Sequence, residues 1–361
     1  MQNLTLGKIL PLLAFILVSF VSLSATQRQI ELSSFPNQAT LSANSDFGFN
    51  VQFRIGELKI REVQTKSGLF DELYVEGWGQ TTDVGEPQLP MLRQMFAVPL
   101  GARVSYTFNS QSARELNASA SKLNNLIVPA QAPISKSSDP ATMPFVLKEK
   151  DYQRKGYNER DWIKVDEIGY LRGVRVFALS FYPVRYDPVG NNLLVMQNLD
   201  VRIDFENPDL LATEELLAKT ASWEFDRAYG QSLFNWQRMD RPSLVRYPTK
   251  MLILVPPNYV STLQPFVDWK RQQGYNVVVT TVGSGGTVAN ATSAINTYMA
   301  SVWSAATAED PAPTYLLIVG DTSTSGDNII SNSGATGSHV TDLTYVRLQG
   351  TDYLPEMYYG R

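Results

Sequence analysis

The sequence predicts a protein in two parts, an all-β domain followed by a partial parallel α/β domain. Short apolar runs with a period of two, separated by turn residues, fill the chain from residue 29 to about 205, as is typical of a β-sandwich. After Lys250 the pattern changes to alternating strands and helices, which predicts a parallel sheet with right-handed crossovers. A chain of 361 residues is also long for one ordinary core, so two domains are expected.

The first residues have the layout of a secretory signal peptide. Lys8 precedes a mostly apolar run from Ile9 to Val21, and the small residues Ser24 and Ala25 follow that run. The run is shorter than the roughly 20 apolar residues that a transmembrane helix needs. We expect residues 1–25 to be a signal peptide and the protein to be secreted or carried on a bacterial cell surface by way of the periplasm. No stable membrane span is then expected once the signal peptide is removed.

The strands of the β domain are predicted from alternation and from turn residues. From Leu199 to Phe205 apolar and charged residues take turns, as in a strand with one solvated face. Residues 187–192 form the predicted loop of a hairpin that joins the last two strands. The predicted strands are Phe49–Ile55, Leu73–Trp78, Met95–Val98, Arg103–Phe108, Val174–Tyr186 and Leu193–Phe205.

Two segments of the first part do not read as strands. Residues 110–138 are polar and rich in Ala and Ser without any period, which predicts a long surface loop. Residues 214–236 are rich in helix formers, whereas residues 238–249 are rich in Arg, Pro and Ser and indicate an exposed linker. We therefore place the domain boundary in this region, with the linker starting at about residue 207.

The elements of the α/β part follow in a βαβαβ order. The first helix is expected to start at a cap on Ser261 or Thr262, to carry Pro265 in its first turn and to end at Gly274, because Pro is tolerated there and Gly favours a helix end. A further short strand is expected at the end of the chain. The expected elements are the strands Met251–Val255, Asn276–Val282 and Tyr315–Val319 and the second helix Asn290–Trp303.

Composition excludes several classes of function for this segment. The net charge is −4 and no basic run occurs, so neither nucleic acid nor an anionic membrane is an expected partner. The segment contains no cysteine, which excludes disulfides, thiolate metal sites and a cysteine nucleophile within it. His339 is the single histidine and lies in a loop rich in Gly, Ser and Thr. A lone loop histidine is more often solvated than catalytic, and no nucleophile is tied to it by spacing.

Two short motifs are candidates for binding. Residues 283–287 (GSGGT) lie between a strand and a helix, but they lack the spacing of a phosphate-binding loop and predict an ordinary connection. Asp321 directly follows the third predicted strand, where open α/β sheets place ligands. Asp352 and Glu356 stand four positions apart in a turn with Gly and Pro. Hard oxygen donors on a bent backbone suit calcium, although exposed turn acids have the same pattern.

Several blocks in the correct order resemble the start of the catalytic domain of gingipains, the secreted cysteine peptidases of family C25. The blocks are Met251–Pro256, Phe266–Lys270, Tyr315–Asp321, Thr341–Asp342, Gly350–Asp352 and Gly360–Arg361. Upstream blocks resemble the β-rich propeptide of the same family, and they are Gly85–Pro90, Val98–Pro99 and Tyr182–Tyr186. The resemblance implies a β-sandwich-like propeptide and a partial, caspase- or gingipain-like parallel α/β domain.

The resemblance also assigns roles to residues. It implies a propeptide over residues 26–246, a truncated catalytic domain over residues 247–361, and processing after Arg246, with Arg241 as the alternative. The propeptide would contact its own catalytic domain, and protein or peptide substrates would be the other partners. The histidine and cysteine that act on the peptide bond come after this region in the family, so no catalytic residue is assigned here. The implied calcium ligands are side chains of Asp321, Asp352 and Glu356 and backbone carbonyls of Gln349 and Leu354.

Two other readings stay open at this point. One is a transpeptidase of the same family from type IX secretion, which would attach cargo to an amine acceptor instead of digesting protein. The other is a non-enzymatic surface or protease-inhibitory module, in which the β-sandwich binds a protease or a glycan and the α/β part is scaffold.

Overall fold

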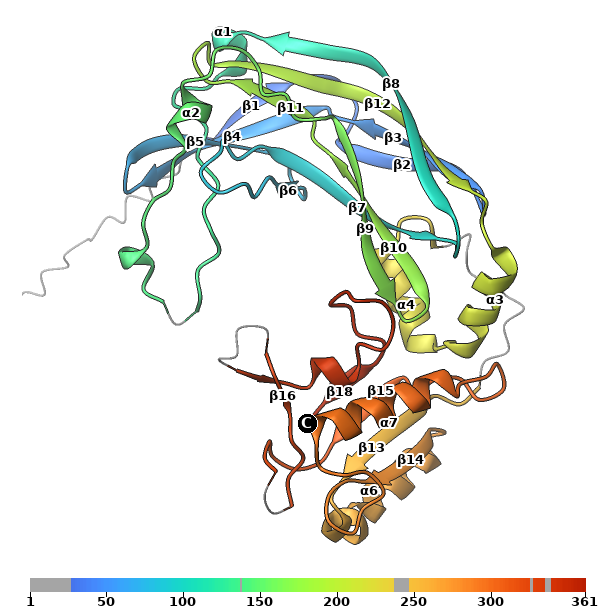
Figure 1. Ribbon diagram of the computed structural model, residues 1–361. Helices are drawn as coiled ribbons and strands as arrows, with labels where there is room; N and C mark the ends of the chain where they lie inside the picture. The colour runs from blue at the N-terminus through green and yellow to red at the C-terminus, as the bar shows by residue number, and fades with distance from the viewer. Residues whose placement is uncertain (1–26, 137, 237–246, 325–326, 335–338) are drawn as a thin grey trace, which may run out of the picture.

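The structure is a computed structural model that describes residues 27–136, 138–236, 247–324, 327–334 and 339–361. A β-rich domain forms an arch, and a smaller α/β domain lies beneath one end of it (Figure 1). Antiparallel sheets in the first domain and a parallel sheet in the second confirm the predicted fold class. The signal-peptide prediction for residues 1–25 falls outside the described residues.

The largest sheet of the β domain is built around one long strand, β12 (Asn192–Glu206). β12 pairs antiparallel with β8 (Arg103–Leu116) along nearly its whole length. It also pairs with β11 (Val184–Asp187) and then with β3 (Gly48–Arg54). β2 (Gln38–Ser45) completes the sheet beside β3. The alternation from Leu199 to Phe205 is confirmed, because the odd-numbered residues there are buried and the even-numbered ones are not.

A second sheet faces the first, and the core lies between them. Phe53 of β3 stacks on Phe181 with ring centroids 4.6 Å apart, and Phe49 meets Phe96 edge-on at 5.2 Å. Such aromatic pairs join the two layers by burying large apolar area. The second sheet consists of β6 (Gly79–Gln80), β7 (Pro90–Val98), β10 (Val174–Phe181) and β9 (Ile163–Leu171). A third sheet consists of β1 (Arg28–Glu31), β4 (Glu57–Thr65) and β5 (Gly68–Tyr74).

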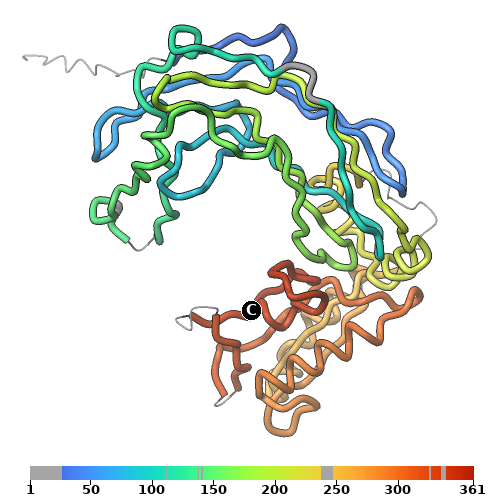
Figure 2. The backbone as a smooth tube through the Cα atoms, turned by 45° about the horizontal axis from the view of Figure 1, so that its top comes forward, coloured from blue at the N-terminus to red at the C-terminus, as the bar shows by residue number. Residues whose placement is uncertain are grey.

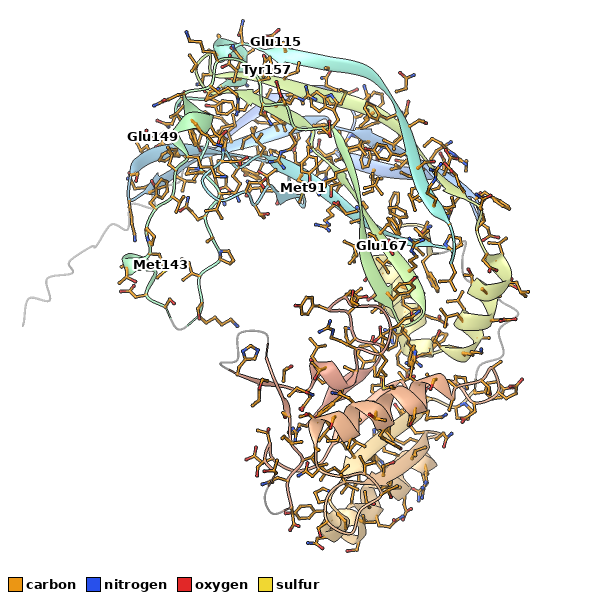
Figure 3. All side chains as sticks on the ribbon, viewed as in Figure 1. Met91, Glu115, Met143, Glu149, Tyr157 and Glu167 are labelled. Carbon is orange, nitrogen blue, oxygen red and sulfur yellow. The ribbon has the colours of Figure 1, made fainter. Side chains whose placement is uncertain are left out.

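The predicted loop over residues 110–138 is partly wrong, because its first residues extend β8 to Leu116 by pairing with β12. Behind β8 the chain forms α1 (Ala118–Ser121), a 3-10 turn (Pro140–Thr142) and α2 (Glu149–Tyr152). Between α1 and α2 a long loop projects from the arch, and Met143 lies near its tip (Figure 3). The base of this loop is closed by Gln131, whose side chain donates to Val146 O at 2.8 Å and accepts from Val146 N at 2.9 Å.

Two helices connect the β domain to the α/β domain. They are α3 (Leu210–Lys219) and α4 (Trp223–Ser232), which agrees with the helix formers noted over residues 214–236. The break falls before Ser222, whose hydroxyl caps α4 by accepting from Phe225 N at 3.5 Å. A side chain that satisfies a free amide in this way favours a new helix start over continuation. The buried faces of α3 and α4 share a hydrophobic cluster with β7 and β10.

The α/β domain is a four-stranded parallel sheet in the order β14, β13, β15, β18. Its elements are β13 (Lys250–Val255), a 3-10 turn (Pro257–Tyr259), α6 (Val260–Gln272), β14 (Asn276–Thr281), α7 (Thr292–Ser304), β15 (Tyr315–Ile318), β16 (Asn332–Ser333), β17 (Val340–Thr341), a 3-10 turn (Leu343–Tyr345) and β18 (Tyr358–Gly360). The βαβαβ order and the parallel sheet are therefore as predicted.

The start of α6 differs from the prediction. The helix begins at Val260 directly after the 3-10 turn, and neither Ser261 nor Thr262 is its cap. Pro265 therefore lies inside the helix and not in its first turn. The predicted end is confirmed, because Gly274 follows the helix with a φ of +91°, a conformation that glycine adopts without strain.

The α/β domain meets the arch at the end that carries β9, β10, α3 and α4, as the turned view of Figure 2 also shows. Among the described helices, none is both long enough and apolar enough to cross a bilayer.

Candidate functional site

The candidate site is built on the tip of the β9–β10 hairpin, which projects from the β domain into the α/β domain. Leu171 pairs with Val174, so Arg172 and Gly173 form a two-residue turn. Both have positive φ, +44° and +84°, as the type I′ turn of a hairpin requires. The turn aims the Arg172 side chain away from its own sheet.

The guanidinium of Arg172 is buried between the two domains, and the residue has 0% exposed surface. It lies 4.9 Å from the ring centroid of Phe225 and 6.0 Å from that of Trp303. Burial lowers the pKa of Arg172 to about 10, so the group stays positively charged at neutral pH. It donates five hydrogen bonds, to Thr220 O (2.8 Å), Pro313 O (2.6 Å), Glu356 O (2.8 Å), Ala312 O (2.7 Å) and Thr314 Oγ1 (3.3 Å).

The backbone on either side of Arg172 also contacts the α/β domain. Tyr170 N donates to Asp352 Oδ2 at 2.9 Å, and Gly173 N donates to Gln349 Oε1 at 3.0 Å. With Glu356 O, which accepts from Arg172, three of the residues assigned to calcium by resemblance therefore accept hydrogen bonds from the hairpin of the β domain. The turn at residues 349–356 is thus part of the interface.

Glu356 is the most unusual acid of this turn. The residue has 0% exposed surface, and its Oε1 has no hydrogen-bond partner among the described residues. Burial raises the pKa of the Glu356 carboxyl to about 7, while the hydrogen bond from Leu348 N to Oε2, at 2.6 Å, opposes that shift. An unpaired buried carboxylate oxygen is a group that a cation would satisfy.

Asp321 is not part of the turn that holds Asp352 and Glu356. It follows β15 in an exposed position, where its Oδ1 accepts from Thr322 N at 2.7 Å. Within the described parts of the chain no three His, Cys, Asp or Glu side chains are grouped so that they could hold a metal ion. Asp352 and Glu356 lie in one turn, in which Leu354 N donates to Asp352 Oδ1 at 2.7 Å. The calcium site stays a prediction.

The described contacts of His339 and of the GSGGT loop lie within the α/β domain. His339 is exposed beside the short β16–β17 hairpin, where its carbonyl accepts from Gly334 N at 2.7 Å. In the GSGGT loop the amides of Gly283, Gly286 and Thr287 donate to groups of the loop and of β14 and to Val288 O, which fits the ordinary connection that was predicted. Arg246 and Arg241, the processing candidates, lie outside the described residues.

Sequence reasoning missed Arg172, although a signal was present. Residues 163–165 and 174–176 alternate at the start of two runs of strand formers, and only Arg172 and Gly173 stand between the two strands. A two-residue hairpin turn favours Asn-Gly or Gly-Gly, because both positions need positive φ. An arginine in the first position departs from that preference and marks a side chain with a role elsewhere.

Comparison with known proteins shows which family this two-domain chain belongs to. A model of the C25 propeptide matches residues 28–227, and a model of peptidase family C25 matches residues 245–361. The chain belongs to peptidase family C25, and it consists of the propeptide and the start of the peptidase domain. The resemblance drawn from the sequence is confirmed.

Gingipains of Porphyromonas gingivalis are among its relatives. The chain is 34% identical to Lys-gingipain over 356 residues, which are 97% of this chain and 20% of that protein. It is 27% identical to gingipain R1 over 340 residues, which are 93% of this chain and 32% of that protein. The chain thus spans about a fifth of the length of the curated Lys-gingipains that it matches.

Solved structures of the same group are also similar. One concerns zymogenic latency of gingipain K from P. gingivalis, with 32% identity and a TM-score of 0.48 over 50% of this chain and 99% of that chain. Another is a complex of the RgpB pro- and mature domains, with 21% identity and a TM-score of 0.43 over 56% of this chain and 100% of that one.

Proposed function

We propose that this chain is the N-terminal part of a secreted, gingipain-like cysteine endopeptidase precursor. Residues 26–246 would act as the propeptide, which keeps the enzyme latent and helps it to fold, and residues 247–361 would begin the catalytic domain. The observation that carries the proposal is the buried contact between the two, in which the β domain places Arg172, with 0% exposed surface, against carbonyls of the α/β domain.

The chemistry of the whole protein would come from residues that follow this region. A thiolate would attack the carbonyl carbon of a peptide bond, and an imidazole would transfer a proton to the departing amine. The segment described here has no cysteine and one histidine, so by itself it should not hydrolyse peptides. Its role in the proposal is to hold the peptidase domain in a latent form.

The finer assignments are part of the same proposal. Export through a signal peptide at residues 1–25 would bring the precursor to the cell surface or beyond. Cleavage after Arg246, or after Arg241, would separate the propeptide from the peptidase domain. Calcium would bind through Asp352 and Glu356, together with Asp321 and the carbonyls of Gln349 and Leu354, and would stabilise the turn; the buried, unpaired Glu356 Oε1 supports this.

The test is to express the precursor together with the coding sequence that follows residue 361. The expected result is no peptide hydrolysis before cleavage of the linker and hydrolysis afterwards, abolished by a thiol-alkylating reagent. Hydrolysis that is absent after cleavage, or that survives alkylation, would refute the proposal. A product joined to an added amine acceptor would point to the transpeptidase, and tight binding of a foreign peptidase by a parent protein without its own nucleophile would point to the inhibitory module.

A further inference from the structure

Arg172 occupies a backbone position that does not favour arginine. Its φ of +44° lies in the left-handed region, where a residue with a Cβ is disfavoured and Asn or Gly is usual. Tyr229 of α4 holds the turn from behind, because its hydroxyl lies 3.0 Å from Arg172 O and 3.2 Å from Leu171 O. Strain that the surroundings maintain in this way is a mark of a functional residue.

The acceptors of the guanidinium are four backbone carbonyls and the Thr314 hydroxyl. Within the described part of the chain, each hydrogen bond that Arg172 donates ends on a neutral oxygen, and three of them end on carbonyls of the α/β domain. Ala312 and Pro313 come just before β15, and Glu356 comes just before β18. These strands are neighbours in the sheet. The Arg172 side chain therefore connects the segments that precede two adjacent strands.

A buried charge whose hydrogen bonds end on neutral oxygens, four of them backbone carbonyls, depends on those contacts. Removal of the guanidinium would leave Ala312 O, Pro313 O and Glu356 O without the donor that they share, in a place that water does not reach easily. Unsatisfied buried carbonyls are unfavourable. The segments that precede β15 and β18 would therefore move apart or become hydrated. The contact between Arg172 and the α/β domain therefore favours a closed interface over one in which the two domains have partly separated.

We propose that Arg172 is the anchor by which the propeptide holds the peptidase domain, through a socket of backbone carbonyls at Ala312, Pro313 and Glu356 that recognises a guanidinium group. The proposal deepens the proposed function and rests on it, since it names the contact through which the propeptide would order the domain that it keeps latent. Because the socket is made of carbonyls, recognition depends on the fold of the peptidase domain more than on its side chains.

The first experiment measures hydrogen exchange on the chain of residues 26–361, in the wild type and in R172M. Peptides that cover residues 312–319 and 345–358 are expected to exchange at least tenfold faster in R172M, while the sandwich strands β3 and β12 keep their rates. R175Q is the matched control, because Arg175 lies three positions away on β10 and pairs with Glu167 of its own domain at 2.8 Å. Unchanged exchange in R172M, or an equal effect of R175Q, would overturn the proposal.

A second experiment tests the carbonyl socket even if R172M does not fold. R172G suits the turn, because glycine adopts positive φ freely, and it leaves the socket empty. Methylguanidine at millimolar concentration is expected to restore slow exchange of residues 312–319 and 345–358 in R172G, whereas methylurea, which has a similar shape and no charge, is not. Equal effects of the two compounds, or no effect of either, would refute the socket.

These outcomes are separate from those that test the proposed function. The exchange experiments use a chain without a catalytic cysteine and need no activity. A parent protein that fails to hydrolyse peptides would remove the peptidase assignment and leave the Arg172 contact intact. Failure of R172M and R172G to loosen the interface would remove the anchor and leave the peptidase assignment standing.

Discussion

The backbone amide of Tyr170 donates a hydrogen bond to Oδ2 of Asp352, with 2.9 Å between the two atoms, across 182 positions of the chain. Tyr170 belongs to the propeptide and Asp352 to the peptidase domain, so this bond joins the two family regions directly. It lies beside the Arg172 turn at the tip of the β9–β10 hairpin. Backbone groups of β9 and its turn therefore take part in the interface together with the Arg172 side chain.

Replacing Asp352 should weaken this junction by a modest amount. D352A removes the acceptor of the Tyr170 amide and of the Leu354 amide, and about 1 kcal/mol of unfolding free energy should be lost for each hydrogen bond. D352N keeps one oxygen and should lose less. Urea unfolding of the two variants and the wild type measures the difference, and a D352A curve that overlays the wild type would contradict the role of this bond.

Phe225 should contribute more than any polar contact of the interface. Its ring packs against Tyr358 of β18 with centroids 4.7 Å apart, and the residue is 3% exposed within the cluster of α4 and β10. F225A should therefore lower the unfolding free energy by about 3–5 kcal/mol. L211A is the control, because Leu211 of α3 is 68% exposed and its loss should change stability by less than about 0.5 kcal/mol. Similar losses in both variants would show that the helices do not pack as described.

The sequence was sufficient for the elements whose signal is local. The alternation from Leu199 to Phe205 identified β12, and Gly274 identified the end of α6, because burial on one face and a positive φ leave direct marks in the residue order. The start of α6 was placed too late, since the 3-10 turn at Pro257–Tyr259 feeds straight into the helix without a side-chain cap. Local capping rules do not describe such a junction.

The interface between the two domains could not be predicted from local sequence patterns. Residues 110–116 look like a loop, yet they form a strand because β12 offers them a partner far away in sequence. Asp352 and Glu356 were identified as a pair in one turn, but the sequence did not show that the propeptide hairpin would reach the same turn. Arg172 carried a signal only as an unfavourable residue in a two-residue turn, and its meaning depends on the opposite domain.

Calcium should change stability through Glu356 if the predicted site exists. At a calcium concentration of roughly 100 Kd the wild type should gain about 2.7 kcal/mol over the chelated protein. E356Q should lose that gain, and in chelator it should be as stable as the wild type or more stable, because a buried carboxylate oxygen without a partner is replaced by a neutral group. E309Q, at an exposed acid, should behave as the wild type. Identical melting curves of the wild type with and without chelator would refute calcium binding.

Cleavage of the linker should leave the two domains together, and salt should not separate them. The contacts across the described interface include buried hydrogen bonds from Arg172 to carbonyls and the packing of Phe225 on Tyr358. Exposed charge pairs are screened in roughly 1 M salt, where the Debye length is about 3 Å, whereas buried contacts are affected much less. After limited digestion by trypsin between residues 237 and 246, both fragments should therefore elute as one species in size-exclusion chromatography at low and at high salt. Fragments that part at high salt would mean that surface charges hold the domains, and fragments that part at low salt would mean that the linker does.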